Sequence, residues 1–129
     1  MKLKNVLMAF SLLIPSGGTV PAAQGASYRP ITMDEAIDIM EEERQYIILD
    51  VRTPEEFKSK HIPGAINIPN EVIGSAEIPA LPDKDQRILV YCRSGNRSKQ
   101  AAAKLAALGY TNIMEFGGIL NWPGETVSE

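Results

Sequence analysis

The chain has very little of the residue types that crosslink small domains or bind metals: one cysteine, Cys92, and one histidine, His61, in 129 residues. A single thiol cannot form a disulfide within its own chain, and one cysteine with one histidine cannot supply a zinc site. The sequence also lacks internal repeats and has no basic cluster interleaved with aromatic residues. It therefore predicts no nucleic-acid partner and implies neither a metal nor an organic cofactor.

No apolar run approaches the ~20 residues that a membrane-spanning helix needs. The run at residues 6–14 follows two lysines and precedes a small, polar stretch, which is typical of a secretory signal peptide. We expect residues 1–25 to direct export to the periplasm or the medium and to be cleaved off after Gly25. Cleavage near residue 22 and an uncleaved interfacial anchor are the alternatives.

Cleavage would leave residues 26–129 as one domain without stable membrane insertion. Without the leader, 11 basic groups face 16 acidic ones and the net charge is −5. An acidic exported domain is a poor candidate for binding nucleic acid or an anionic membrane.

Helical and strand patterns alternate along this domain. Capping boxes beginning at Thr32 and Thr53 predict two helix starts, and Gly109 is a natural end for a third helix. Buried strands alternating with helices predict the α/β class, a parallel sheet with helices on both faces. The predicted strands are 46–49, 65–68, 87–91 and 112–116, the third helix is 99–108, and 70–85 is expected to be a surface excursion with a partial helix.

Asp50 and Cys92 each come directly after a predicted strand. The carboxyl ends of parallel strands meet at one edge of a sheet, and ligands bind beyond that edge. We therefore expect these two residues to share the functional edge.

Cys92 opens a seven-residue loop between a strand and a helix start. Gly95 allows the positive φ that turns loop amides inward, and the helix adds the positive end of its dipole. These features favour the thiolate, which is the nucleophilic form of cysteine, and would equally hold the outer sulfur of a persulfide. Cys92 is the catalytic candidate, and the binding candidates are Arg93, Ser94, Gly95, Asn96, Arg97 and Ser98.

Several of these residues have structural alternatives. Ser94, Asn96 and Ser98 can serve only as helix caps, and Arg93 can be a solvated surface charge. A lone cysteine can also be a small buried apolar residue.

Arg97 lies at a helix start, where the dipole disfavours a cation, so it calls for an anionic ligand or a carboxylate such as Asp50. We expect Asp50 to hydrogen-bond the loop or to pair with an arginine, and we assign Asp50 and Arg52 a supporting role. His61 is expected to be structural, because a thiolate stabilised by its loop does not require a base.

Three blocks of the chain resemble the rhodanese-like sulfurtransferases, in particular their small, exported, single-domain members. The blocks are Leu49–Phe57 with His61–Pro69, Cys92–Ser98, and Gly117–Gly118 with Trp122. The resemblance implies a five-stranded parallel sheet flanked by helices. It also implies transfer of sulfane sulfur from a small donor such as thiosulfate to cyanide or a thiol, through a persulfide on Cys92.

Three rival functions remain open. Phosphatases and arsenate reductases of the same fold use five residues between cysteine and arginine, whereas this chain has four between Cys92 and Arg97. A tetrahedral oxyanion needs a wider ring of amides than one sulfur atom, so the short loop favours sulfur. The other two rivals are a non-enzymatic persulfide carrier with a protein acceptor, and a redox role through mixed disulfides.

Overall fold

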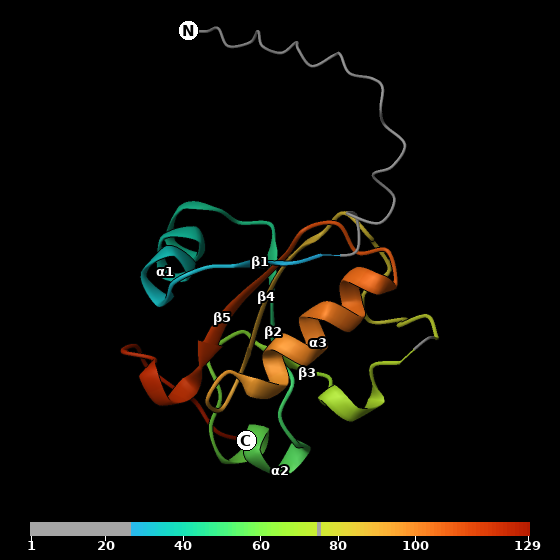
Figure 1. Ribbon diagram of the computed structural model, residues 1–129. Coiled ribbons are helices and arrows are strands. Elements are labelled where there is room, and N and C mark those ends of the chain that lie inside the picture. The colour runs from blue at the N-terminus through green and yellow to red at the C-terminus, as the bar shows by residue number, and fades with distance from the viewer. Residues whose placement is uncertain (1–26, 75) are drawn as a thin grey trace, which may run out of the picture.

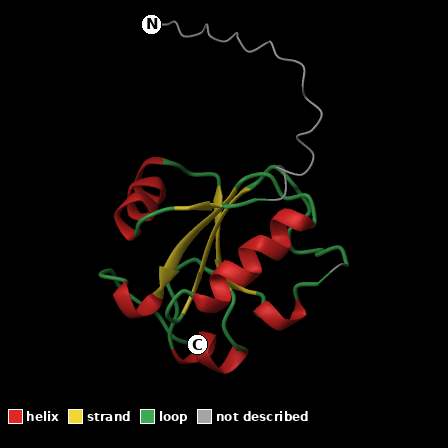
Figure 2. Cartoon of the chain, in the orientation of Figure 1, coloured by secondary structure: helices red, strands yellow, loops and turns green. Residues whose placement is uncertain are grey.

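The computed structural model describes residues 27–74 and 76–129, which form a five-stranded parallel sheet with helices around it (Figures 1 and 2). The sheet order is β1-β5-β4-β2-β3, so β4 is the central strand. The predicted leader, residues 1–25, lies outside the described residues. The strands are β1 (Arg29–Pro30), β2 (Tyr46–Asp50), β3 (Ile66–Asn67), β4 (Arg87–Cys92) and β5 (Ile113–Gly118).

Two helices cover opposite faces of the sheet, as the alternating pattern predicts (Figure 1). Helix α1 (Met33–Glu42) packs Ala36 into one buried cluster with Leu89, and α3 (Asn96–Ala107) packs Leu105 into the other with Val90. Leu89 and Val90 are consecutive in β4 and point to opposite faces, which is why this strand is buried on both sides. The α/β prediction with helices on both faces is confirmed.

The shorter helical elements lie at the ends of strands. Helix α2 (Pro54–Ser59) follows β2, and single 3₁₀ turns follow β3 and β5, η4 (Asn70–Val72) and η5 (Ile119–Asn121). No helix within the described part of the chain is long and apolar enough to cross a bilayer.

Local signals in the sequence place the starts of α1 and α2 and the end of α3 correctly, whereas α3 begins at Asn96, earlier than the predicted residue 99. The side chains of Thr32 and Thr53 accept from the amides of Glu35 and Glu56, and both glutamates reach back to the cap, so both capping boxes are formed. Gly109 follows α3 with φ of +102°, as expected of a residue just past a helix end.

The segment 70–85 is only partly the surface excursion that its composition predicts. The partial helix is present as η4, but Ile73 and Leu81 are buried in the cluster beneath α3. The Tyr110 hydroxyl donates to the Leu81 carbonyl at 2.5 Å and ties the segment to the core. Its apolar residues are irregularly spaced among proline and glycine and follow neither a helical nor a strand period, so the sequence alone does not reveal this burial.

Candidate active site

Asp50 and Cys92 end the neighbouring strands β2 and β4, so they share one edge of the sheet as expected. Their side chains, however, belong to opposite faces. Cys92 is part of the cluster beneath α3, whereas Asp50 bonds to Tyr91, which is part of the cluster beneath α1. The two side chains therefore act in separate networks.

The Cys92 sulfur sits inside the loop that opens α3. The Gly95 amide donates to Sγ at 3.0 Å, and the Ser98 hydroxyl oxygen lies 3.4 Å from the same atom. Gly95 has φ of +111°, the left-handed conformation that turns its amide toward the sulfur. It is also the N-cap of α3, which has no side-chain cap, so a capping role for Ser94 or Asn96 is not supported.

The environment of Cys92 contains opposing effects on its pKa. Burial raises the pKa of the thiol, but hydrogen bonds from the Ser98 hydroxyl and from the amides of Ser98, Gly95 and Ser94 lower it by more. The net result is a pKa below the ordinary value for cysteine. The loop therefore favours the thiolate, in agreement with the expectation from the sequence.

Arg97 pairs with a carboxylate, one of the two partners expected for it, but that carboxylate is Glu56 rather than Asp50. Its two terminal nitrogens donate to the two Glu56 oxygens at 2.8 and 3.1 Å, a bidentate bridge between α3 and α2. Hydrogen bonding from Arg97 is the main reason that the pKa of Glu56 falls to about 2. Asp50 is not available, because Arg52 already holds it.

Asp50 and Arg52 form a buried pair, which is one of the two contacts expected for Asp50. The Arg52 guanidinium donates to Asp50 Oδ2 and to the Lys60 carbonyl, both at 2.6 Å. The Tyr91 hydroxyl donates to the same Asp50 oxygen at 2.6 Å, and burial followed by this hydrogen bond raises the pKa of Tyr91. The pair therefore ties the end of β2 to β4 and to the segment after α2.

Arg93 is the exposed cation of the loop. No hydrogen bond or ion pair engages its side chain within residues 27–74 and 76–129. It lines a hollow of about 430 Å³ at the sheet edge, together with Arg52, Glu56, Lys60 and Leu120. Its guanidinium is therefore available to an anionic ligand that approaches the loop.

Two residues of β5 lie against the loop, and one of them, Glu115, carries no signal in the sequence. Glu115 is buried in β5 and accepts from the Ser98 hydroxyl at 2.6 Å and from the Gly117 amide at 2.9 Å. A Cβ at Gly118 would overlap the Arg93 carbonyl. Glu115 lies in a strand beside apolar residues, and the adjacent sequence gives no sign that its carboxylate contacts the cysteine loop.

The His61 side chain makes structural contacts with Phe57. Its Nδ1 lies 2.7 Å from the Phe57 carbonyl and its ring stacks on the Phe57 ring, with centroids 3.7 Å apart. Its backbone pairs with Val127. These contacts agree with the expectation that His61 is not a general base for Cys92.

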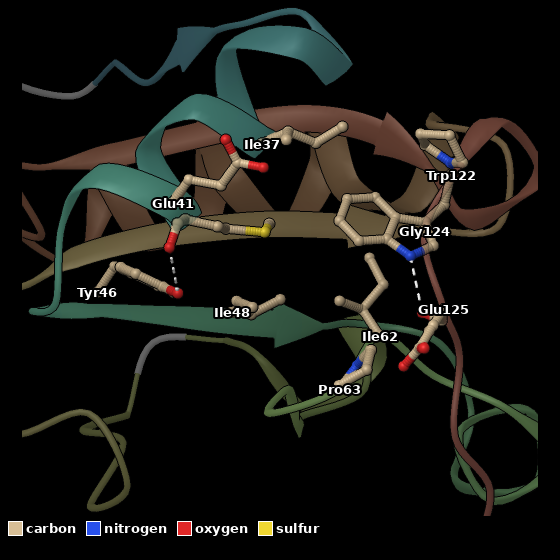
Figure 3. A pocket seen from close by; sticks show the side chains of 11 residues that line it. Ile37, Glu41, Tyr46, Ile48, Ile62, Pro63, Trp122, Gly124 and Glu125 are labelled. Carbon is tan, nitrogen blue, oxygen red and sulfur yellow. Dashed lines mark hydrogen bonds between the residues drawn. The ribbon is translucent and has the colours of Figure 1, made fainter.

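A second hollow, of about 420 Å³, opens on the α1 side of the sheet (Figure 3). Ile37, Ile48, Ile62 and Trp122 make it mainly apolar, and the Trp122 indole donates to the Glu125 carbonyl at 2.9 Å. No candidate site residue lines it, and Cys92 lies on the other face. The described part of the chain also holds no group of three or more metal-ligating side chains placed to bind an ion.

Fold and site together define a class of protein. They define an α/β domain with a parallel sheet whose central strand ends in a candidate nucleophile, a thiol held by the amides of a loop that opens a helix. A rhodanese-like domain matches residues 32–125, and the chain belongs to the rhodanese family.

Relatives and solved structures of the family match different shares of the chain. The thiosulfate sulfurtransferase PspE of Escherichia coli is 41% identical over 71 residues, 55% of this chain and 68% of that protein. A probable adenylyltransferase/sulfurtransferase, MoeZ of Mycobacterium tuberculosis, is 36% identical over 102 residues, 78% of this chain but 26% of that protein. The structure of an Escherichia coli rhodanese with anions superposes with a TM-score of 0.60 and 36% identity, covering 65% of this chain and 99% of the other.

Proposed function

We propose that the protein is a thiosulfate sulfurtransferase that carries sulfane sulfur as a persulfide on Cys92. Its relatives, PspE among them, are sulfurtransferases by name, which supports sulfur transfer in general. The observation that carries the proposal is the contact of the Gly95 amide with Cys92 Sγ, in a loop that lowers the pKa of the thiol.

The proposed reaction has two steps. In the first, the Cys92 thiolate attacks the outer sulfur of thiosulfate, a new S–S bond forms, the S–S bond of thiosulfate breaks and sulfite leaves with the electron pair. In the second, cyanide or a thiolate attacks the outer sulfur of the persulfide, and Cys92 leaves as a thiolate. Neither step requires a metal or an organic cofactor, because each is a nucleophilic displacement at sulfur in which the attacking group supplies the electron pair and the leaving group takes one away.

The loop residues have separate roles in this scheme. The amides from Arg93 to Ser98 hold the anionic outer sulfur, and Arg93 attracts the anionic donor into the hollow at the sheet edge. Arg97 orients the donor through the guanidinium N–H groups that Glu56 does not use, while Glu56 fixes its position. Ser94 and Asn96 are exposed at the mouth of the loop and contact the donor through short polar side chains.

The test pairs two measurements on the purified protein and on Cys92→Ser. Each is mixed with thiosulfate, its intact mass is measured, and thiocyanate is assayed after cyanide is added. The proposal expects the wild type to gain one sulfur atom and to yield thiocyanate, and the variant to do neither. A wild type that gains no sulfur and yields no thiocyanate contradicts it.

A phosphatase is the rival enzyme, and turnover of a phosphate ester by the wild type but not by Cys92→Ser would favour it. The four-residue spacing between Cys92 and Arg97 argues against this outcome.

A protein acceptor is the second candidate, favoured by Leu120, whose side chain is 60% exposed beside Arg93 in the hollow. In that case the wild type gains sulfur but transfers it poorly to cyanide. Mixed-disulfide chemistry would instead give a mass gain with a small thiol under oxidising conditions and none with thiosulfate.

We also propose that residues 1–25 direct export, so that the reaction takes place in the periplasm or outside the cell. The basic start and short apolar run support this proposal. Determining the N-terminal residue of protein recovered from the extracytoplasmic fraction tests it. A first residue near Ala26 is expected, and protein confined to the cytoplasm with Met1 retained contradicts it.

A further inference from the structure

The Ser98 hydroxyl has more acceptors than protons. Its oxygen lies 2.6 Å from Glu115 Oε2 and 3.4 Å from Cys92 Sγ. The carbonyls of Gly95 and Gly117 are also near, at 3.0 and 3.3 Å. A hydroxyl carries one hydrogen, so it donates one strong hydrogen bond at a time. Because the carboxylate contact is the shortest, Ser98 donates to Glu115 in the thiol form, and its oxygen accepts from the Cys92 thiol.

Glu115 cannot turn away from this contact into solvent. It is 2% exposed, and its Oε2 also accepts from the Gly117 amide at 2.9 Å. Its other oxygen lies 3.7 Å from the Lys99 ammonium. The carboxylate is therefore held in place beneath the loop, with one oxygen aimed at the Ser98 hydroxyl.

Ionisation of Cys92 creates a second charged acceptor for the same hydrogen. We propose that Glu115 competes with the Cys92 thiolate for the single proton of the Ser98 hydroxyl and thereby restrains thiolate formation. Glu115 is thus a positioning residue that acts through Ser98. The inference deepens the function proposed above and rests on Cys92 being its nucleophile.

The acceptor of the Ser98 hydroxyl then depends on whether the Cys92 sulfur is charged. It faces Glu115 while Cys92 is a thiol, turns to Sγ in the thiolate, and returns to Glu115 when persulfide formation leaves Sγ uncharged. The proton that Cys92 loses passes to water, and the Ser98 hydroxyl keeps its own proton and only changes its acceptor.

Other charged and titratable groups surround this carboxylate. Helix α3 contributes Lys99, which lies beside Glu115, and Arg97 in its first turn, whose charge interacts with that of Cys92. Strand β4 places Val90 opposite Glu115 and β1 places Pro30 there, neither of which is charged. Tyr28, before β1, packs on the same side of the sheet. The Ser98 hydroxyl is the group that contacts both Glu115 and Cys92.

The test measures the rate of Cys92 alkylation by iodoacetamide as a function of pH. It compares the wild type with Glu115→Gln, Ser98→Ala and the double variant. Glu115→Gln removes the charged competitor, so the midpoint of its pH profile is expected about one pH unit below that of the wild type. At pH values below the midpoints of both proteins, this shift corresponds to alkylation that is about tenfold faster in the variant. Ser98→Ala removes the donor to the thiolate and is expected to raise the midpoint.

The double variant separates competition through Ser98 from simple charge repulsion. Competition predicts that Glu115→Gln has almost no effect once Ser98 is alanine. An equal downward shift with and without the hydroxyl overturns the proposal, and so does an unchanged or raised midpoint in Glu115→Gln. Glu77→Gln, at a carboxylate that is 84% exposed, controls for the change in net charge and is expected to leave the midpoint unchanged.

Glu115→Asp provides a second variant in case the glutamine variant fails to fold, as judged by thermal melting. It keeps the charge but withdraws the carboxylate from Ser98, so its midpoint is expected to fall as well. A midpoint equal to that of the wild type contradicts the proposal. Alkylation needs only the thiolate, so absence of thiocyanate formation in the wild type would remove the proposed function while leaving this readout intact.

Discussion

Gly118 lies so close to the Arg93 carbonyl that any side chain at this position would overlap it. The Leu120 amide donates to the same carbonyl at 3.2 Å. The end of β5 is therefore packed directly against the cysteine loop, and the loop is held from this side as well as by α3. Its shape depends on a residue that is 26 positions away from Cys92 in the chain.

Gly118→Ala is expected to displace the loop and to lower the free energy of unfolding by about 1–3 kcal/mol, because the new Cβ has no room. Alkylation of Cys92 at neutral pH is expected to slow, since the displaced amides no longer stabilise the thiolate. Urea denaturation and the alkylation rate measure the two effects. Gly74→Ala is the matched control, because nothing lies within 4 Å of a Cβ there; equal behaviour of the two variants would contradict the packing argument.

Arg93→Ala is expected to raise KM for thiosulfate about fivefold and to change kcat little, because the exposed guanidinium attracts the donor without contacting Sγ. The effect is expected to shrink at high ionic strength. Steady-state kinetics at two salt concentrations measure it. Arg44→Ala removes the same charge at the opposite edge of the sheet and is expected to have no effect; a large fall in kcat for Arg93→Ala would argue for a role in the chemical step.

Glu56→Gln is expected to lower the free energy of unfolding by about 1 kcal/mol at pH 7, because it breaks the partly exposed pair with Arg97. The folded pKa of about 2 lies below the ordinary value of 4.5, so this stabilisation is complete above about pH 5 and is lost as the pH falls toward 2. Urea denaturation of both proteins across this range tests the prediction. A difference that stays constant with pH would rule out the ion pair as its source, and Glu55→Gln in the same helix is the control.

Tyr91→Phe is expected to lower the free energy of unfolding by about 1–3 kcal/mol. The change removes the 2.6 Å hydrogen bond to Asp50 and leaves the Ile62 amide, which donates to the same hydroxyl at 3.1 Å, without its acceptor in the core. Tyr46→Phe removes one hydrogen bond at a half-buried site and is expected to cost less. Chemical denaturation of both variants provides the comparison, and equal losses would mean that the buried network adds nothing.

The elements with local signals are those that sequence analysis places well. Thr32 and Thr53 mark helix starts because a capping box is made by residues three positions apart. The apolar run before Cys92 marks the central strand, because a strand that is buried on both faces needs apolar side chains at consecutive positions. β1 has no such signal, since it consists of two residues that are held by pairing with β5.

The partners of the charged site residues cannot be read from local signals, because they are far away in the chain. Arg97 and Glu56 are 41 positions apart, as are Tyr91 and Asp50. Which carboxylate meets which cation depends on the order of the strands and on the face to which each side chain points. The suggestion of Asp50 as the carboxylate for Arg97 failed for this reason, because Arg52 binds Asp50 and Glu56 binds Arg97.

The sequence by itself determined the candidate nucleophile, the loop around it and the α/β class, because a thiol, a glycine with positive φ and a helix start lie within seven consecutive residues. Only the tertiary structure decided that Glu115 meets Ser98, that Gly118 meets Arg93 and that Glu56 holds Arg97. These contacts join strands and helices that neighbour one another only after the sheet has formed, and local periodicity carries no information about such neighbours.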